Sequence, residues 1–143
     1  MYTLHANIFF SDLDTRNPNH AACHGLLERL YNSTTPIIIP LFVLAEVASF
    51  VSQELHDPKR GRLAVSLLRS MQHIRLVGLN DGLAQDAVEI AADYELNAYD
   101  AIYVAVARHY AAPLVTVDHE LCKRMLGIMP VHRPEELLAA LIP

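Results

Sequence analysis

Short apolar runs alternate with longer amphipathic segments along the whole chain. The short runs are rich in β-branched residues and bounded by turn-forming residues, which predicts strands over residues 2–5, 37–39, 74–77, 114–117 and 129–132. The longer segments carry apolar residues at helical spacing, which predicts a helical turn at 8–10 and helices over 17–31, 41–55, 60–72, 81–91, 100–107, 120–126 and from 134 onward. Strands that alternate with helices in this way predict a parallel sheet covered by helices on both faces.

The size and composition of the chain favour one well-cored domain spanning residues 1–143, since 52% of its residues are hydrophobic. We expect a cytoplasmic protein without membrane contact, because no apolar stretch approaches the roughly 18 residues of a membrane span and the amino terminus has no signal-like pattern. Cys23 and Cys122 form no metal-type spacing. They are predicted to be reduced thiols inside helices.

The charge of the chain limits the ligands to consider. A net charge of −5 argues against unspecific binding of polyanions, which draws on clustered Lys and Arg. Lys59, Arg60 and Arg62 form the one basic cluster, directly after the Asp57–Pro58 break. This cluster has two interpretations, a solvated helix face or a local contact with RNA.

Two aspartates are predicted to meet at one edge of the sheet. Asp100 begins a helix that is apolar nearly all round, and Asp118 follows the β-branched run at 114–117. Open α/β sheets bind their ligands at the carboxyl ends of the strands. Two carboxylates at that edge indicate a divalent cation held through oxygen, although each aspartate can instead be the N-cap of its helix.

Glu46 strengthens the interpretation that the acids hold a divalent cation. Its neighbours at helical spacing include Phe42, Val43 and Phe50, so its side chain leaves from an apolar helix face. A lone buried carboxylate is costly and needs a cation, a hydrogen-bond network or a position open to solvent. We therefore expect Glu46 to point at the same sheet edge as the two aspartates.

Three segments carry a resemblance to a known family. The stretches I-P-L-F-V-L-A-E-V, Y-D-A-I-Y-V-A-V-A and P-L-V-T-V-D-H-E-L resemble the PIN-domain nucleases, and within them the toxin of the VapBC type. The resemblance implies a three-layer α/β/α sandwich with a central parallel sheet of roughly four to five strands. It also implies an acidic pocket that binds Mg²⁺ or Mn²⁺ and cleaves RNA. Glu46, Asp100 and Asp118 match three of the family's metal-binding, catalytic acids, and Thr116 matches a supporting polar residue.

The chain departs from this family at the end of the first strand. Family members place an acid there in a D-x-N or D-x-S setting, whereas this chain reads His5-Ala6-Asn7. The site can be inactive, can prefer Mn²⁺ or another softer ion with His5 as a ligand, or can recruit Asp12 or Asp14 in place of the missing acid. His5 can equally be a hydrogen-bonded structural histidine. Asn7 is either a pocket residue or an ordinary turn residue.

Two functions follow from these observations. The first is a metal-dependent endoribonuclease in which a metal-activated water hydrolyses the phosphodiester, controlled by a small antitoxin whose basic side chain enters the acidic pocket. The second is a PIN-like module that has lost catalysis and serves as a binding or assembly partner. We also expect the protein to form a homodimer.

Overall fold

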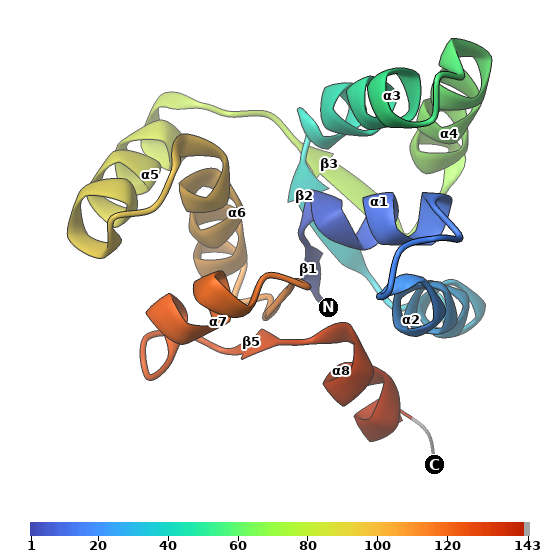
Figure 1. Ribbon diagram of the computed structural model, residues 1–143. Coiled ribbons are helices and arrows are strands. Elements are labelled where there is room, and N and C mark those ends of the chain that lie inside the picture. Colours follow the sequence, from blue (N-terminus) through green and yellow to red (C-terminus); the bar gives the residue numbers. More distant parts are fainter. Residues whose placement is uncertain (142–143) are drawn as a thin grey trace.

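The computed structural model describes residues 1–141 and contains short parallel strands at its centre (Figure 1). The strands are β1 (Thr3–Leu4), β2 (Ile37–Pro40), β3 (Ile74–Val77), β4 (Leu114–Val115) and β5 (Val131–His132). β1, β4 and β5 form one parallel sheet, and β2 pairs with β3 in a second. A parallel bridge between Tyr2 and Ile37 joins the two sheets, which gives the order β3-β2-β1-β4-β5. The predicted central parallel sheet is confirmed, but it is divided at this bridge.

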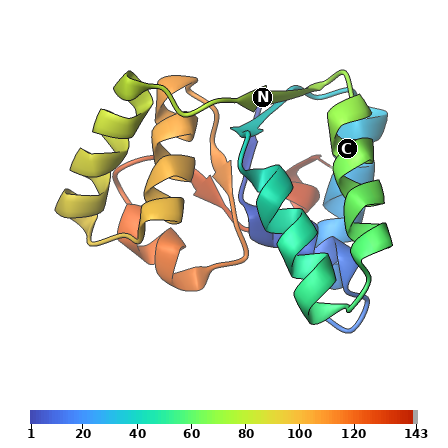
Figure 2. The same ribbon diagram turned by 90° about the horizontal axis from the view of Figure 1, so that it is seen from above.

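Helices cover both sides of the strands (Figures 1 and 2). The helices are α1 (Ala6–Leu13), α2 (His20–Asn32), α3 (Val43–Glu54), α4 (Pro58–Ser70), α5 (Asp81–Tyr94), α6 (Ala98–His109), α7 (His119–Met125) and α8 (Pro134–Leu141). α6 packs on β1, β2 and β4 with α5 outside it, whereas α1 to α4 lie on the opposite side. The predicted three-layer α/β/α sandwich is therefore confirmed.

Helix boundaries follow the capping chemistry of single residues. Asn80 and Asn97 each accept a hydrogen bond from the backbone N–H three positions on and so cap α5 and α6. α5 extends beyond the predicted residue 91 and ends at Tyr94, before Glu95 in the left-handed region at φ 54°. α2 likewise begins at His20 rather than residue 17, because His20 N donates to Asn17 O in a turn.

α6 forms the centre of the core. The run from Tyr103 to Ala107 is at most 1% exposed, as the apolar sequence of this helix predicts. Tyr103 is among the largest fully buried side chains, so its hydroxyl needs a partner inside the protein. That requirement brings α6 into contact with the polar residues of the sheet edge.

Two further expectations concern the thiols and the membrane. Cys23 is buried, Cys122 is half-buried, and both are free, as predicted. Burial raises the pKa of the Cys23 thiol to about 11, which keeps it protonated and unreactive.

Within residues 1–141, no helix combines the length and apolar character needed to cross a membrane.

Candidate functional site at the carboxyl edge of the sheet

The candidate site lies where β1 and β4 end side by side. His5 follows β1 and donates its backbone N–H to Val115 O at 2.9 Å, which holds the two parallel strand ends together. Glu46 reaches this edge from α3, and Asp100 reaches it from the first turn of α6. The edge therefore collects side chains from three parts of the sequence.

His5 and Asp100 are bonded directly to each other. His5 Nε2 lies 2.8 Å from Asp100 Oδ1, and the two side chains are only 12% and 15% exposed. The backbone N–H of Asn7 donates to His5 Nδ1 at 3.3 Å, so His5 is the N-cap of α1. Because Nδ1 accepts this bond, the proton of the neutral imidazole is on Nε2 and is donated to Asp100.

Asp100 is also held from its own helix. Its Oδ2 accepts a hydrogen bond of 2.9 Å from Asn97 Nδ2, while its backbone N–H donates to Asn97 Oδ1. Asn97 is therefore the N-cap of α6, and Asp100 is not. Both carboxylate oxygens of Asp100 already have a donor within the protein.

Glu46 joins the same cluster through Tyr103. The Tyr103 hydroxyl donates to Glu46 Oε1 at 2.8 Å, and the Tyr103 ring lies 4.5 Å from the His5 ring, centroid to centroid. Burial is the main cause that raises the pKa of the Glu46 carboxyl, and the charge of Asp100 raises this pKa further. The hydrogen bond from Tyr103 and the nearby His5 lower it and so offset part of the rise. We call His5, Glu46, Asp100 and Tyr103 the edge cluster.

Asp118 has a different local role. Its Oδ1 accepts from Glu120 N at 2.9 Å and from Leu121 N at 3.1 Å, so Asp118 is the N-cap of α7. Its own N–H donates to Thr116 Oγ1 at 3.1 Å. The capping interpretation therefore holds for Asp118, whereas for Asp100 it does not.

Asn7 connects the Asp118 side of the edge to β1. Its Nδ2 donates to Thr116 Oγ1 at 2.9 Å, and its Oδ1 accepts from Val117 N at 3.2 Å. The hydroxyl of Thr116 is completely buried and receives bonds from both Asn7 and Asp118. In this structure the two residues predicted to support the pocket contact each other.

The residues present do not fit a divalent ion in this arrangement. Within the described residues, no three His, Cys, Asp or Glu side chains lie close enough together to hold an ion. A metal-binding histidine normally donates its other N–H to an acceptor, but the second nitrogen of His5 faces the N–H of Asn7. The assignment of Glu46, Asp100 and Asp118 as metal ligands therefore stays a prediction.

The residues considered as replacements for the missing acid are engaged elsewhere. Asp12 Oδ1 lies 2.8 Å from His24 Nδ1 at the α1–α2 surface, and Asp14 Oδ1 accepts from Arg16 Nε at 3.0 Å. The pKa of the His24 imidazole is raised, first by its hydrogen bond with Asp12. Neither aspartate contacts the edge cluster, so the structure gives no support for such a replacement.

The basic cluster lies on α4, away from these contacts. Lys59, Arg60 and Arg62 are all exposed, and Arg60 Nη2 donates to Leu13 O at 2.9 Å. This bond ties the start of α4 to the end of α1. These contacts agree with a solvated helix face, and a role in RNA binding stays a prediction.

A groove lined by aromatic residues borders the edge cluster, and the sequence interpretation missed it. It has a volume of about 510 Å³, and we call it the aromatic groove. Its lining residues come from α1, from α3 and its N-cap residue, and from the first turn of α6: Phe10, Phe42, Ala45, Glu46, Ser49, Phe50, Gln53, Glu54 and Tyr99. Phe10 stacks on Phe50 with centroids 4.5 Å apart, and Tyr99 is 61% exposed. The spacing of Phe42 and Phe50 on α3 is the only sequence signal, and it equally describes core residues.

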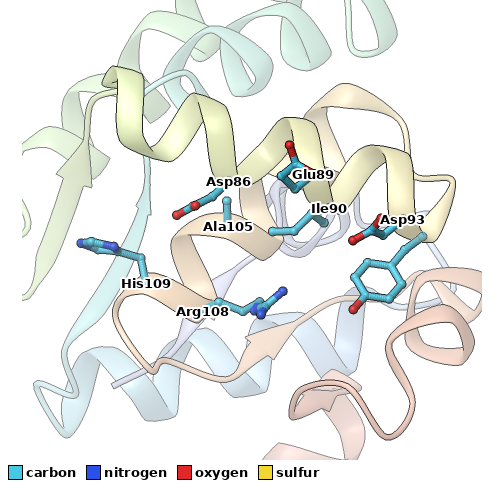
Figure 3. Close-up of a pocket in the computed structure, with 8 residues that line it drawn as sticks. Asp86, Glu89, Ile90, Asp93, Ala105, Arg108 and His109 are labelled. Atoms are coloured by element: carbon cyan, nitrogen blue, oxygen red, sulfur yellow. The ribbon is translucent and has the colours of Figure 1, made fainter.

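A second hollow of about 440 Å³ lies between α5 and α6 (Figure 3). Asp86, Glu89 and Asp93 on α5 and Arg108 and His109 on α6 line it, and all five are exposed. It shares no lining residue with the edge cluster or the aromatic groove. We regard it as the solvated outer surface of this helix pair.

The chain matches the model of a known family. The family model of the PIN domain matches residues 2–125, and the chain therefore belongs to the PIN domain family. The resemblance drawn from the sequence motifs is confirmed. No curated protein matches the chain.

Solved structures of toxin–antitoxin proteins share this fold. A toxin–antitoxin complex from Klebsiella pneumoniae is 24% identical, with a TM-score of 0.67 over 94% of this chain and 98% of that one. VapBC2 from Rickettsia felis, bound to a DNA fragment from its promoter, is 18% identical, with a TM-score of 0.69 over 92% and 97%. VapC20 from Mycobacterium tuberculosis, described as a sarcin-ricin loop cleaving toxin, is 17% identical, with a TM-score of 0.69 over 86% and 94%. At these identities the likeness shows the fold.

Proposed function

We propose that this PIN domain is the toxin-type subunit of a two-protein pair, and that its function as built is to bind a small antitoxin-type protein in the aromatic groove. The observation that carries this proposal is the groove itself, where Phe10, Phe50 and the exposed Tyr99 surround an opening beside Glu46. Solved relatives of the same fold are toxin–antitoxin complexes, which supports a partner of this kind.

The charge and apolar surface of the groove favour one kind of partner. The charged residues that line it are Glu46 and Glu54, and the chain as a whole has a net charge of −5. This environment opposes the phosphates of a nucleic acid and favours apolar side chains next to a Lys or Arg. An amphipathic peptide segment with one basic residue satisfies both requirements.

Metal-dependent RNA cleavage is the second candidate. It is favoured by the position of Glu46 and Asp100, which are close enough at the strand ends for Asp100 to raise the pKa of Glu46. Carboxylate oxygens are the ligands that Mg²⁺ and Mn²⁺ prefer. Against it stands the His5–Asp100 pair, which engages one of these carboxylates with a proton donor at 2.8 Å.

Co-purification tests the partner proposal. If a short reading frame adjoins the gene, its product is co-expressed with the chain, and complex formation is compared for wild type, Tyr99→Asp and the control Leu126→Asp. Leu126 is 83% exposed and lies outside the groove, so its variant controls for a new surface charge. We expect Tyr99→Asp alone to weaken binding, by about 30-fold or more for an aromatic hot spot. Failure of wild type to form the complex, or equal binding by all three proteins, would contradict the proposal.

The oligomeric state is a separate question. The homodimer expected from the sequence belongs to this proposal, because toxin-type subunits can assemble through a surface other than the groove. Light scattering of the purified chain, alone and with its partner, measures it directly.

A further inference from the structure

We propose that the aromatic groove continues into a hollow with basic residues at its far end, and that the two dock one helical segment of the partner. This segment has a basic residue at the Glu46 end and an acidic residue at the Arg60 end. The inference rests on the proposed function, because it takes the groove as a docking surface. It adds the charge that the partner presents at each end.

The groove and the hollow follow each other along the helices α1 and α3. Within the groove, Phe10 of α1 stacks on Phe50 of α3. The hollow has a volume of about 330 Å³ and is lined by residues that follow these two helices, among them Arg16 and His56. Glu54, the last residue of α3, lines both spaces. We call the groove and the hollow together the docking channel.

The basic residues that line the docking channel are gathered in the hollow. They are Arg16, His56 and Arg60, and none of them lines the aromatic groove, whose charged residues are Glu46 and Glu54. The channel is therefore acidic beside the edge cluster and carries its cations only at the far end. A partner that matches both ends needs opposite charges on its two ends.

Arg60 is the cation that a partner can reach. It forms no ion pair within residues 1–141, whereas Arg16 donates to both carboxylate oxygens of Asp14 at 3.0 and 3.3 Å. Glu54 lines the same hollow but is not within ion-pair distance of Arg60. Arg60 donates to Leu13 O at 2.9 Å, and because a guanidinium has five N–H groups, it can also bond a carboxylate of the partner.

The walls of the docking channel favour a helical segment. None of its lining residues belongs to a strand, so an extended segment would find no strand edge for its backbone N–H and C=O groups, whereas a helix pairs its own. The rise of α3 from Glu46 to Glu54 is about 12 Å, and the hollow lies beyond Glu54. A helix of about three turns, with its two charged residues about 11 positions apart on one face, spans this distance.

The experiment measures the binding of two labelled synthetic peptides by fluorescence anisotropy. Each peptide has about 16 residues, an apolar face of Leu and Phe, and a Lys near one end, and about 11 positions further on one peptide has Glu and the other Gln. Wild type is compared with Arg60→Gln and with the conservative variant Arg60→Lys. Arg62→Gln is the matched control, because Arg62 is an exposed residue of the same helix that does not line the hollow.

Wild type should prefer the Glu peptide by about three- to fivefold, the range of an exposed ion pair. Arg60→Gln should lose this preference, and Arg60→Lys and Arg62→Gln should retain it. A thermal unfolding curve of each variant checks that it is folded. A preference that persists in folded Arg60→Gln would overturn the assignment of the acidic end to Arg60.

Tyr99→Asp separates this inference from the proposed function. Equal binding of both peptides to wild type, with loss of both in Tyr99→Asp, would keep the groove as a docking surface and overturn the acidic end of the partner. Binding of neither peptide to wild type would contradict the docking surface and the charge order together.

Discussion

Asn7 Nδ2 donates a hydrogen bond of 2.9 Å to the buried hydroxyl of Thr116, across 109 positions of sequence. The same Asn7 side chain accepts from Val117 N, and Thr116 Oγ1 also accepts from Asp118 N. The end of β1 is thereby joined to the segment that leads into α7. The position of Asp118 relative to His5 depends on this junction.

Asn7→Ala should therefore destabilise the protein. The substitution leaves the part-buried Val117 N without its acceptor and removes one of the two donors to the Thr116 hydroxyl, which costs about 1–3 kcal/mol of unfolding free energy. Chemical denaturation measures the loss, with the exposed Asn32→Ala variant as the control expected to stay within about 0.5 kcal/mol. Equal unfolding free energies for the two variants would show that the junction contributes nothing.

Glu46→Gln should change how stability depends on pH. The pKa of Glu46 is raised in the folded state, chiefly by burial, so between its unfolded and folded pKa values the folded protein binds the extra proton. Wild type should accordingly lose stability relative to Glu46→Gln as the pH rises above the ordinary pKa range of a glutamate carboxyl. Glutamine can still accept the Tyr103 bond, so the comparison isolates the charge. Denaturation at several pH values tests this, and a difference that is constant with pH would contradict it.

Asp118 should behave as a helix cap in stability measurements. Asp118→Ala removes the acceptor for two N–H groups of α7 and should reduce the unfolding free energy by about 1 kcal/mol. Asp118→Ser should recover most of this loss, because serine caps helices nearly as well. If alanine and serine destabilise equally, the carboxylate of Asp118 is needed for something other than capping.

Much of the fold could be predicted from the chain itself. The fully buried run Ile37–Pro40 has the β-branched composition of a parallel strand, and α6 is apolar on nearly every side. Asn80 was recognisable as a cap because it directly precedes the apolar helical pattern of α5. These features depend on local sequence, which is why the prediction holds for them.

The chemistry of the edge could be predicted only in part. Sequence reasoning selected Glu46, Asp100 and Asp118, with His5 as a further candidate. The structure links His5, Glu46 and Asp100 through Tyr103 and the His5–Asp100 bond, whereas Asp118 caps α7. Sequence reasoning could not give the tautomer of His5, which depends on the N–H of Asn7 and on an acid 95 positions away. It also assigned no role to Tyr103, since a buried tyrosine in an apolar helix looks like ordinary core. The aromatic groove was missed for the same reason, because aromatic spacing does not reveal exposure.

The central claim is that this PIN edge, closed by the His5–Asp100 pair, does not hydrolyse RNA. RNA cleavage by the wild-type chain tests it most directly. A mixed pool of single-stranded and hairpin RNA is incubated with wild type, with Asp100→Asn and with His5→Asp, each in Mg²⁺ and in Mn²⁺. We predict that wild type leaves the pool intact in both ions, as Asp100→Asn does. Ion-dependent cleavage by wild type that is lost in Asp100→Asn would contradict the account and establish the ribonuclease.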